Sequence, residues 1–338
     1  MKKLLATLLI LLLTLTTLVS CFGPSNDTEN GQPEEQVKLR IGYMSGPTGM
    51  GMAKLISDNG GLENGNDKYS FTKYADTNAA KADLAAGKID LICLPTNEAA
   101  VFHNNVDRNA KVLAVNCLNS LYLITNKNTT VTSLADLEGQ TIYTCKNGTP
   151  RMVLEYIVKE AGINATVSYT IDGKDILTPA DLSAQVVAGN LPNAVMPEPL
   201  VTSSLLAIAK NGNTDIAYSV DVDLTDEWAN VCDTPVVMGC IVADGDILTD
   251  ANEDTINSFL NEYKASIEYI SNPQNIDSAA NYVVETGVMG AAPAAKKALA
   301  NLGDSIAFLE GEQMKNALEA FYQAIGIAKP DNNFYYER

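Results

Sequence analysis

The side chains best suited to chemistry in this sequence are small polar residues that follow strand-like segments. In two places a glycine-containing turn and a threonine precede a helical pattern, at Gly46–Thr48 and at Gly148–Thr149. We predict that Thr48 and Thr149 cap these helices. A helix N-terminus carries unpaired backbone N–H groups and the positive end of the helix dipole, so each turn can receive a small polar or anionic ligand. A tight turn between a strand and a helix, with no ligand-binding role, would give the same sequence pattern.

Other polar loops converge with these two if two sheets face each other, because the carboxyl ends of parallel strands meet at one edge. Their side chains can orient a ligand, but they do not pair a nucleophile with a base. Glu198 stands between two prolines, and it could accept an N–H from a ligand or stabilise the start of its own helix. The predicted substrate-binding residues are Ser45, Gly46, Thr48, Gly49, Met50, Thr96, Asn97, Asn119, Asn147, Gly148, Thr149 and Glu198.

The common motifs for nucleotide binding and hydrolysis are missing. Gly46 and Gly51 are not followed by the Lys-Ser/Thr pair of a P-loop, and Gly49-Met50-Gly51 is not followed by the third glycine of a dinucleotide fingerprint. His103 is the one histidine, and there is no G-x-S-x-G serine. We therefore predict no catalytic residue and no cofactor, with a solvent-facing or capping role for His103.

Two acidic clusters could suggest a metal. Asp221, Asp223 and Asp226 form one, and Asp244 and Asp246 form the other. Neither has the glycine and the distal glutamate of an EF-hand loop in register. We interpret both as solvated turns and predict no metal site.

The cysteines do not form a recognisable framework. Cys93, Cys117 and Cys145 each lie at the end of an apolar run, which is typical of core residues. Only Cys232 and Cys240, which flank one predicted strand, could form a disulfide, and their geometry would decide it.

The N-terminus has the pattern of a bacterial lipoprotein. A short basic start and an apolar stretch fill residues 1–20, and Ser20 precedes Cys21 at the expected cleavage point. We predict a signal peptide over 1–20, lipidation of Cys21, and a polar tether over 21–36. The mature chain would then be attached by its lipid to the outer face of the bacterial cell membrane. An uncleaved anchor or an ordinary secretion signal is the alternative.

Length and charge restrict the partners. About 300 residues follow the tether, which suits two domains rather than one core. The chain carries 41 acidic against 23 basic residues, a formal net charge of −18. This surplus argues against nucleic acid and against anionic lipid as partners, since both select basic patches.

The pattern of elements predicts an α/β protein with two lobes. Strands over 39–43, 69–74, 89–94 and 110–117 alternate with helices, which indicates a mainly parallel sheet covered by helices. A second series of strands and helices over 141–219 repeats this alternation. The sequence from residue 249 onward has a helical pattern. We predict lobe 1 from 37–118 and 236–338, and lobe 2 from 119–235, so that the chain crosses between lobes twice.

Four stretches resemble extracytoplasmic solute-binding proteins of ABC importers, within the NMT1/THI5-like group. They are IGYMSGPTGMGMAKL (41–55), AAGKIDLICLPTNEAA (85–100), SLADLEGQTIYTCKNGTP (133–150) and AVMPEPL (194–200). The resemblance covers most of the chain from Val37 to about Lys210. It implies a type II periplasmic-binding-protein fold with a double hinge, which closes on one small ligand as a monomer. The partners it implies are a membrane permease and its cytoplasmic ATPase.

The resemblance leaves the ligand open. The group includes binding proteins for nitrate, sulfonates, taurine and thiamine-pyrimidine precursors. Only Lys146 and Arg151 lie near the predicted mouth, so an anion is not favoured over a neutral or amine-bearing heterocycle. A tethered ligand sensor, or an enzyme acting on a small metabolite on the same fold, remains an alternative function.

Overall fold

The computed structural model describes residues 37–105, 109–127 and 130–338, which belong to one compact unit. The predicted signal peptide, Cys21 and the tether lie outside the described residues. Within the described ranges, every helix is too short or too polar to cross a bilayer.

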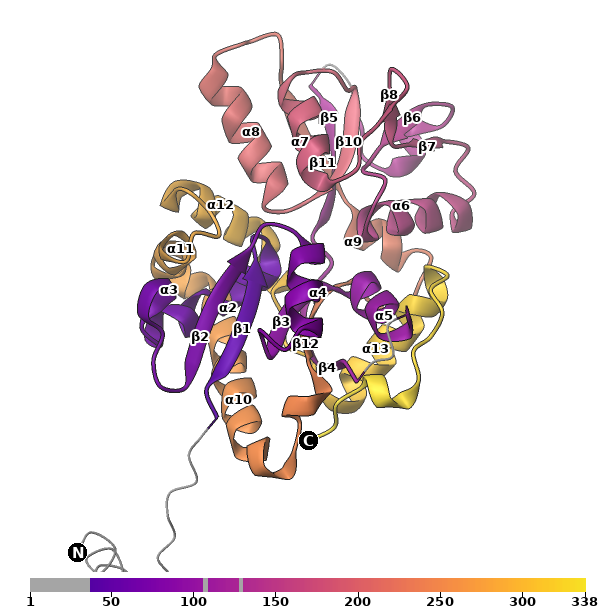
Figure 1. Cartoon of the computed structure of the whole chain (residues 1–338). Helices are drawn as coiled ribbons and strands as arrows, with labels where there is room; N and C mark the ends of the chain where they lie inside the picture. The colour runs from indigo at the N-terminus through magenta and orange to yellow at the C-terminus, as the bar shows by residue number, and fades with distance from the viewer. Residues whose placement is uncertain (1–36, 106–108, 128–129) are drawn as a thin grey trace, which may run out of the picture. The chain divides into compact units, whose positions relative to one another are not determined.

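The first sheet has five strands in the order β2-β1-β3-β12-β4 (Figure 1). β1 runs parallel to β2 and β3, whereas β12 runs antiparallel to β3 and β4. β12 has the opposite direction because the chain re-enters this sheet after passing through a second sheet. The strands are β1 (Leu39–Met44), β2 (Tyr69–Tyr74), β3 (Leu91–Pro95), β4 (Lys111–Leu118) and β12 (Val237–Ala243). We call this sheet and its helices lobe 1.

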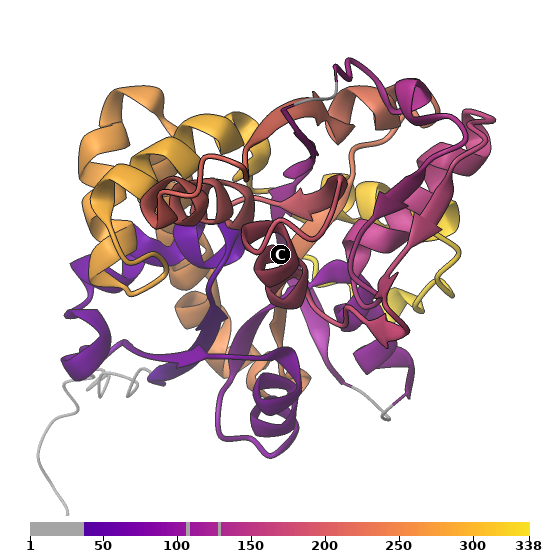
Figure 2. The ribbon, with the colours of Figure 1, turned by 90° about the horizontal axis from the view of Figure 1, so that it is seen from above.

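Both faces of this sheet are buried, which explains its continuous apolar strands. Along β3, Leu91 and Cys93 face one core while Ile92 and Leu94 face another. The first core lies under α2 (Pro47–Asp58), α10 (Glu253–Ser271), α11 (Ile276–Glu285) and α12 (Ala292–Leu302). The second lies under α4 (Thr77–Ala85), α5 (Thr96–Asn105) and α13 (Gly311–Ala324). A short helix, α3 (Gly61–Asn64), leads into β2. The helical C-terminal segment therefore returns to lobe 1, and α11 and α12 lie together in it (Figure 2).

The second sheet, in lobe 2, also contains one strand that runs antiparallel to both of its neighbours. β5 (Leu121–Asn126) lies between β10 (Asn193–Pro197) and β11 (Tyr218–Asp223) and is antiparallel to both. β6 (Thr141–Tyr143) pairs in parallel with β7 (Thr166–Ser168). The side chain of Asn193 connects the two groups, because it donates to Thr141 O and accepts from Tyr143 N. The other elements are β8 (Thr170–Ile171), β9 (Lys174–Asp175), α6 (Thr149–Glu160), α7 (Pro179–Val187), α8 (Leu200–Asn211) and α9 (Leu224–Ala229).

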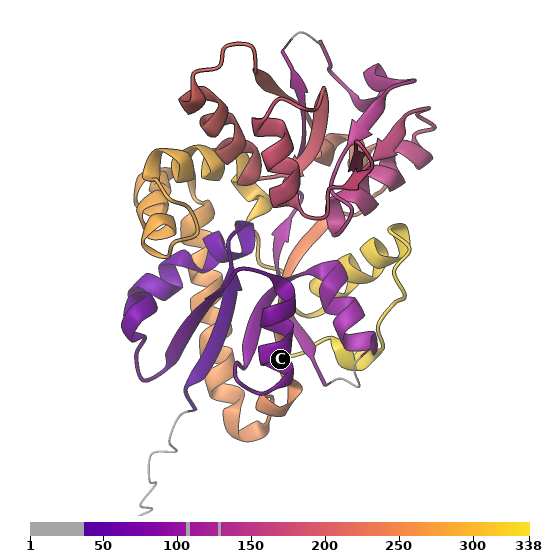
Figure 3. The same cartoon turned by 45° about the horizontal axis from the view of Figure 1, so that its top comes forward.

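The chain passes between the sheets after β4 and again after α9 (Figure 3). At the first passage, Asn119 and Ser120 adopt positive φ angles of 51° and 76°. The Asn119 N–H donates to Val236 O at 2.7 Å, which ties the two passages together. α12 also contacts α8 of lobe 2. The exact lobe boundaries stay a prediction.

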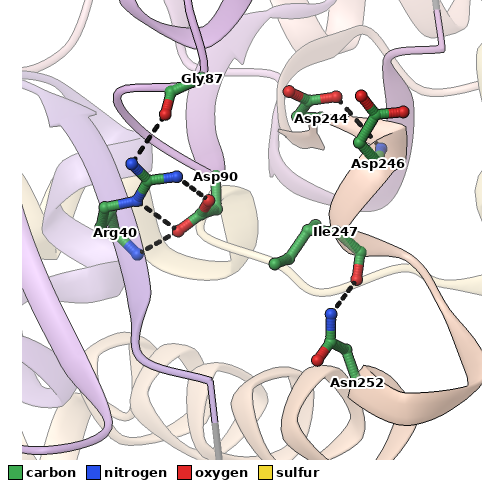
Figure 4. A network of polar contacts seen from close by, with 7 residues as sticks. All are labelled: Arg40, Gly87, Asp90, Asp244, Asp246, Ile247 and Asn252. Atoms are coloured by element: carbon green, nitrogen blue, oxygen red, sulfur yellow. Dashed lines mark hydrogen bonds and ion pairs between the residues drawn. The ribbon is translucent and has the colours of Figure 1, made fainter.

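An ion pair between Arg40 and Asp90 stabilises lobe 1 near the amino end of β1 (Figure 4). Asp90 accepts hydrogen bonds from the backbone N–H of Arg40 and from its guanidinium, at 2.5 to 3.0 Å. Arg40 also donates to Gly87 O. These contacts hold the amino end of β1 against the start of β3, and they leave the carboxyl end of β1 to form the opposite edge.

Most predicted elements are present, but three expectations were wrong. The last strand of the series predicted over 141–219 extends to Asp223 instead of ending at Ser219, and a bulge between Val220 and Val222 interrupts its alternation. His103 is 7% exposed rather than solvent-facing, with Nδ1 2.8 Å from Ala110 O and its ring against Phe334. The cluster read as a solvated turn begins α9, since Asp223 accepts from Thr225 N.

Candidate functional site

A cavity with a volume of about 1380 Å³ lies between the two lobes. Lobe 1 contributes the ends of β1 and β2, the starts of α2 and α4, and the loop before α12. Lobe 2 contributes the starts of α6 and α7 and one side of α8. The cavity therefore lies at the edge where the strands of both lobes end.

The N-terminus of α2 forms the lobe 1 side of the cavity. Gly46, with φ 131°, holds the N-cap position, and Pro47 starts the helix. A Cβ on Gly49 would lie 2.1 Å from Met44 O, so glycine is what lets α2 begin directly against the end of β1. The N–H groups of this first turn have no carbonyl four residues earlier within the helix.

α6 forms the matching structure in lobe 2. Gly148, with φ 95°, holds the N-cap position, and Thr149 and Pro150 start the helix. The prediction that Thr48 and Thr149 are the caps was wrong, and neither helix has a side-chain cap hydrogen bond. The reason is steric, because the cap residue has a positive φ that threonine rarely adopts. Both helices nevertheless begin with a glycine at the N-cap, followed by a proline and a threonine within the first two helical positions.

Thr149 instead connects the lobes. Its Oγ1 donates to Asn97 Oδ1, at the start of α5, over 2.9 Å. Thr149 is 2% exposed and Asn97 7% exposed, so this hydrogen bond is shielded from water. It forms only when the two lobes are close together, as they are here.

Glu198 makes the second polar contact between the lobes. Its carboxylate accepts from Thr202 N and Oγ1 within its own helix, and from Asn301 Nδ2 of α12 at 2.6 Å. The backbone carbonyl of Asn301 accepts in turn from Tyr122 OH of β5. Glu198 is 1% exposed and lines the cavity. Of its two predicted roles, the contact with its own helix is present in the structure.

The predicted site residues divide into two groups. Seven line the cavity: Ser45, Gly46, Thr48, Asn147, Gly148, Thr149 and Glu198. The other five lie outside its lining: Gly49, Met50, Thr96, Asn97 and Asn119. Met50 belongs to the core under α2, and Thr96 donates to Val237 O. Their part in ligand binding stays a prediction.

The sequence analysis missed the apolar part of the lining. Met44, Tyr74, Met238 and Met289 line the cavity from lobe 1, and Leu206 lines it from α8. Tyr74 and Met44 end alternating strands, which is a signal that could have identified them. Met289 follows α11 and Met238 lies within β12, so only the topology brings them to the site.

The cavity wall includes a thiol, but burial suppresses its reactivity. Burial raises the pKa of the Cys117 thiol to about 12, and the same cause raises the pKa of Cys93 to about 12. A thiol with so high a pKa remains protonated at neutral pH and is a poor nucleophile. All five cysteines in the described ranges are free, including Cys232 and Cys240.

These thiols predict how stability changes at high pH. An unfolded cysteine ionises near pH ~8.5, so between about pH 9 and 12 the native state binds more protons than the unfolded state. The free energy of unfolding should therefore fall as pH rises, by up to about 1.4 kcal/mol per pH unit for each thiol. Urea unfolding at about pH 8 and pH 10 measures this slope. The Cys117→Ala variant should show a smaller slope, and an equal slope would contradict the assignment.

Metal-binding geometry is not found in the part of the chain that the structure describes, where no three His, Cys, Asp or Glu side chains are grouped to hold an ion. Asp244 accepts from Asp246 N, and Asp221 accepts from Thr125 N and Oγ1. Both acidic clusters are thus used for local structure.

Comparisons with known proteins agree on a family and a fold. A family model described as NMT1/THI5 like matches residues 73–276. Among solved structures, an ABC transporter protein from Parabacteroides distasonis is 18% identical, with a TM-score of 0.67 over 89% of this chain and 99% of that chain. The ligand-binding component of an ABC-type import system from Staphylococcus aureus, with zinc bound, is 13% identical, with a TM-score of 0.67 over 89% and 97%.

The periplasmic aliphatic sulphonate binding protein SsuA from Escherichia coli is 18% identical, with a TM-score of 0.65 over 89% of this chain and 92% of that chain. A comparison with curated proteins gives no significant match. At these identities the structural likeness shows the fold, which is the α/β fold of periplasmic binding proteins.

Proposed function

Since the chain belongs to the NMT1/THI5-like family, we propose that it is the ligand-binding component of an ABC importer. It captures one small molecule between its lobes and delivers it, unmodified, to a membrane permease with a cytoplasmic ATPase. The observation that carries this proposal is the cavity lined by matching helix N-termini, α2 from one lobe and α6 from the other. A ligand in this cavity contacts both lobes at once and favours their closed arrangement.

The proposal includes the location of the protein. Cys21 carries a lipid after removal of residues 1–20, and the tether over 21–36 leaves the binding unit outside the cell membrane. The protein acts as a monomer, with its lipid as its contact with the membrane. Similar proteins named as import components support this location and a binding role rather than turnover.

Closure should depend on the hydrogen bond between Thr149 and Asn97. Replacing Asn97 with alanine removes a buried contact between the lobes, and we expect a loss of ligand affinity of about 5-fold, since one such bond contributes about 1 kcal/mol. The ligand is first found by a thermal-shift screen of small metabolites, and the dissociation constant is then measured by calorimetry. Small-angle X-ray scattering should show that the ligand makes the wild type more compact.

A control lies on the same helix. Asn104 of α5 donates to Ala328 O at an exposed position outside the cavity lining, so Asn104→Ala should leave the affinity unchanged. Mass spectrometry of the released compound completes the test. Recovery of a chemically altered compound would indicate an enzyme, and a folded protein that binds nothing in the screen would contradict the importer role.

A further inference from the structure

The shape and lining of the cavity restrict the class of ligand. Sites that hold drug-sized molecules have volumes of about 300–1,000 Å³. The cavity here, at about 1380 Å³, exceeds that range. A nitrate ion or a short sulfonate would leave most of it to water, so the volume favours a larger organic molecule.

Prolines make part of the wall rigid and contribute no backbone hydrogen-bond donors there. Six of the 13 prolines in the chain line the cavity: Pro47, Pro95, Pro150, Pro179, Pro197 and Pro199. A proline has no backbone N–H, and its ring fixes φ, so it presents a stiff apolar surface. An oxyanion needs several donors around it, and these six prolines supply none from their backbone.

Large apolar side chains cover the space between the prolines. Leu177 is 46% exposed and Leu206 39% exposed, and both belong to the lobe 2 wall of the cavity. Met44, Met238 and Met289 face them from lobe 1. Methionine adapts its shape and has a polarisable sulfur, which suits contact with an apolar or aromatic surface. Two exposed leucines in one cavity wall indicate a surface that a ligand covers.

Most charged side chains of the lining already have partners within the protein. Lys81 forms an ion pair with Glu98 at 2.7 Å, and Lys73 donates to Gly287 O. Asp76 accepts from the first turn of α4, and Glu198 is held by Asn301. The remaining lining cation, Lys210, is exposed in the last turn of α8.

The two cations expected at the mouth are engaged elsewhere. Lys146 pairs with Asp175 and Arg151 with Glu155, and both lysine and arginine lie outside the cavity lining. The formal net charge of −18 also disfavours the approach of a small anion. The helix N-termini of α2 and α6 remain to receive one polar group of a ligand.

We propose that the cavity binds an organic molecule with a drug-sized, mainly apolar body and a single polar end, rather than a small oxyanion. This inference rests on the proposed function, because it assigns the substrate class of the same cavity. The body lies against the proline, methionine and leucine surface, and the polar end lies at the starts of α2 and α6.

Three probe molecules distinguish the contribution of an apolar body to binding from that of a charged group. N-phenyl-1-naphthylamine is the neutral body, 8-anilinonaphthalene-1-sulfonate adds a sulfonate to it, and methanesulfonate is the charged group with almost no body. We expect the neutral probe to bind one molecule per chain, saturably, with enhanced fluorescence. Methanesulfonate at about 10 mM should neither displace it nor change the melting temperature, since affinity weaker than millimolar leaves a site largely empty.

Variants localise the binding to the cavity wall. Leu177→Asp and Leu206→Asp place a charge in the apolar surface, and each should weaken the neutral probe at least about 10-fold. Val220→Asp is the matched control, because Val220 is 44% exposed on lobe 2 and lies outside the lining. It should bind the probe as the wild type does, and circular dichroism confirms that each variant is folded.

The outcomes separate this inference from the proposed function. Displacement of the fluorescent probe by micromolar methanesulfonate, or stabilisation by that ion alone, would overturn the ligand class while supporting an importer of small anions. Absence of saturable probe binding, or binding unaffected by both aspartates, would overturn the apolar-body inference. The proposed function itself fails if the metabolite screen also finds no ligand of any class, or if the bound compound is recovered chemically altered.

Discussion

Replacing Trp228 with alanine should lower the free energy of unfolding by about 4 kcal/mol, among the largest losses expected for a single residue here. Trp228 is 1% exposed, and its Nε1 donates to Thr234 O. Its ring centroid lies 4.9 Å from that of Tyr156 in α6 and 5.7 Å from that of Phe321 in α13. One side chain therefore joins a helix of lobe 2 to a helix of lobe 1.

The position of Trp228 also predicts a change in cooperativity. With the ring removed, the lobes share less apolar surface, so the urea transition followed by circular dichroism should broaden or divide in two. Phe259→Ala is the control. Phe259 is fully buried between Tyr69 and Tyr263 within lobe 1, so its loss should cost a similar free energy without broadening. Equal broadening in both variants would contradict a coupling role for Trp228.

The sequence identified the fold because its strongest signals are physical requirements of that fold. Leu91–Leu94 and Val112–Val115 are apolar throughout because helices cover both faces of their sheet. The helical pattern expected from residue 249 onward is present in α10, α11, α12 and α13. The return of the helical segment to lobe 1 was also predicted, since too few strands remained for a separate sheet.

The site was only partly predictable, because several of its contacts join residues that are distant in the chain. The sequence placed Thr149 in the site, but nothing local showed that its hydroxyl would bind Asn97. Glu198 was ambiguous for the same reason, as its bond to Asn301 depends on how α12 packs. Asp223 was read as part of a solvated turn, although an aspartate before Thr225 is also a helix-start signal. For Thr149 and Glu198, tertiary contacts decided among locally equal alternatives, whereas the contact of Asp223 is local.

Replacing Gly239 with alanine should weaken ligand binding by about 10-fold or more, because it displaces the start of α2. Gly239 lies in β12 behind the cavity wall, and a Cβ there would come 2.4 Å from Thr48 Cγ2 and 2.8 Å from Asn116 Oδ1. Asn116 cannot easily retreat, since its Nδ2 donates to Tyr263 OH in the core. Thr48, which lines the cavity, has to move instead. The loss of stability should be about 1–3 kcal/mol, as for other overpacked cores.

A second substitution tests whether this clash is the cause. Thr48→Ser removes the methyl group that the new Cβ would meet, so it should restore much of the affinity and stability lost in Gly239→Ala. The rescue should be partial, because the contact with Asn116 Oδ1 remains. Gly290→Ala is the control, since Gly290 also lines the cavity but has no atom within 4 Å of an added Cβ. If Thr48→Ser recovered nothing, or if Gly290→Ala lost as much affinity, the position of α2 would not be what determines binding. If Thr48→Ser improved affinity in the Gly239→Ala background but not in the wild type, this would show that the packing of β12 against Thr48 sets the geometry of the binding cavity.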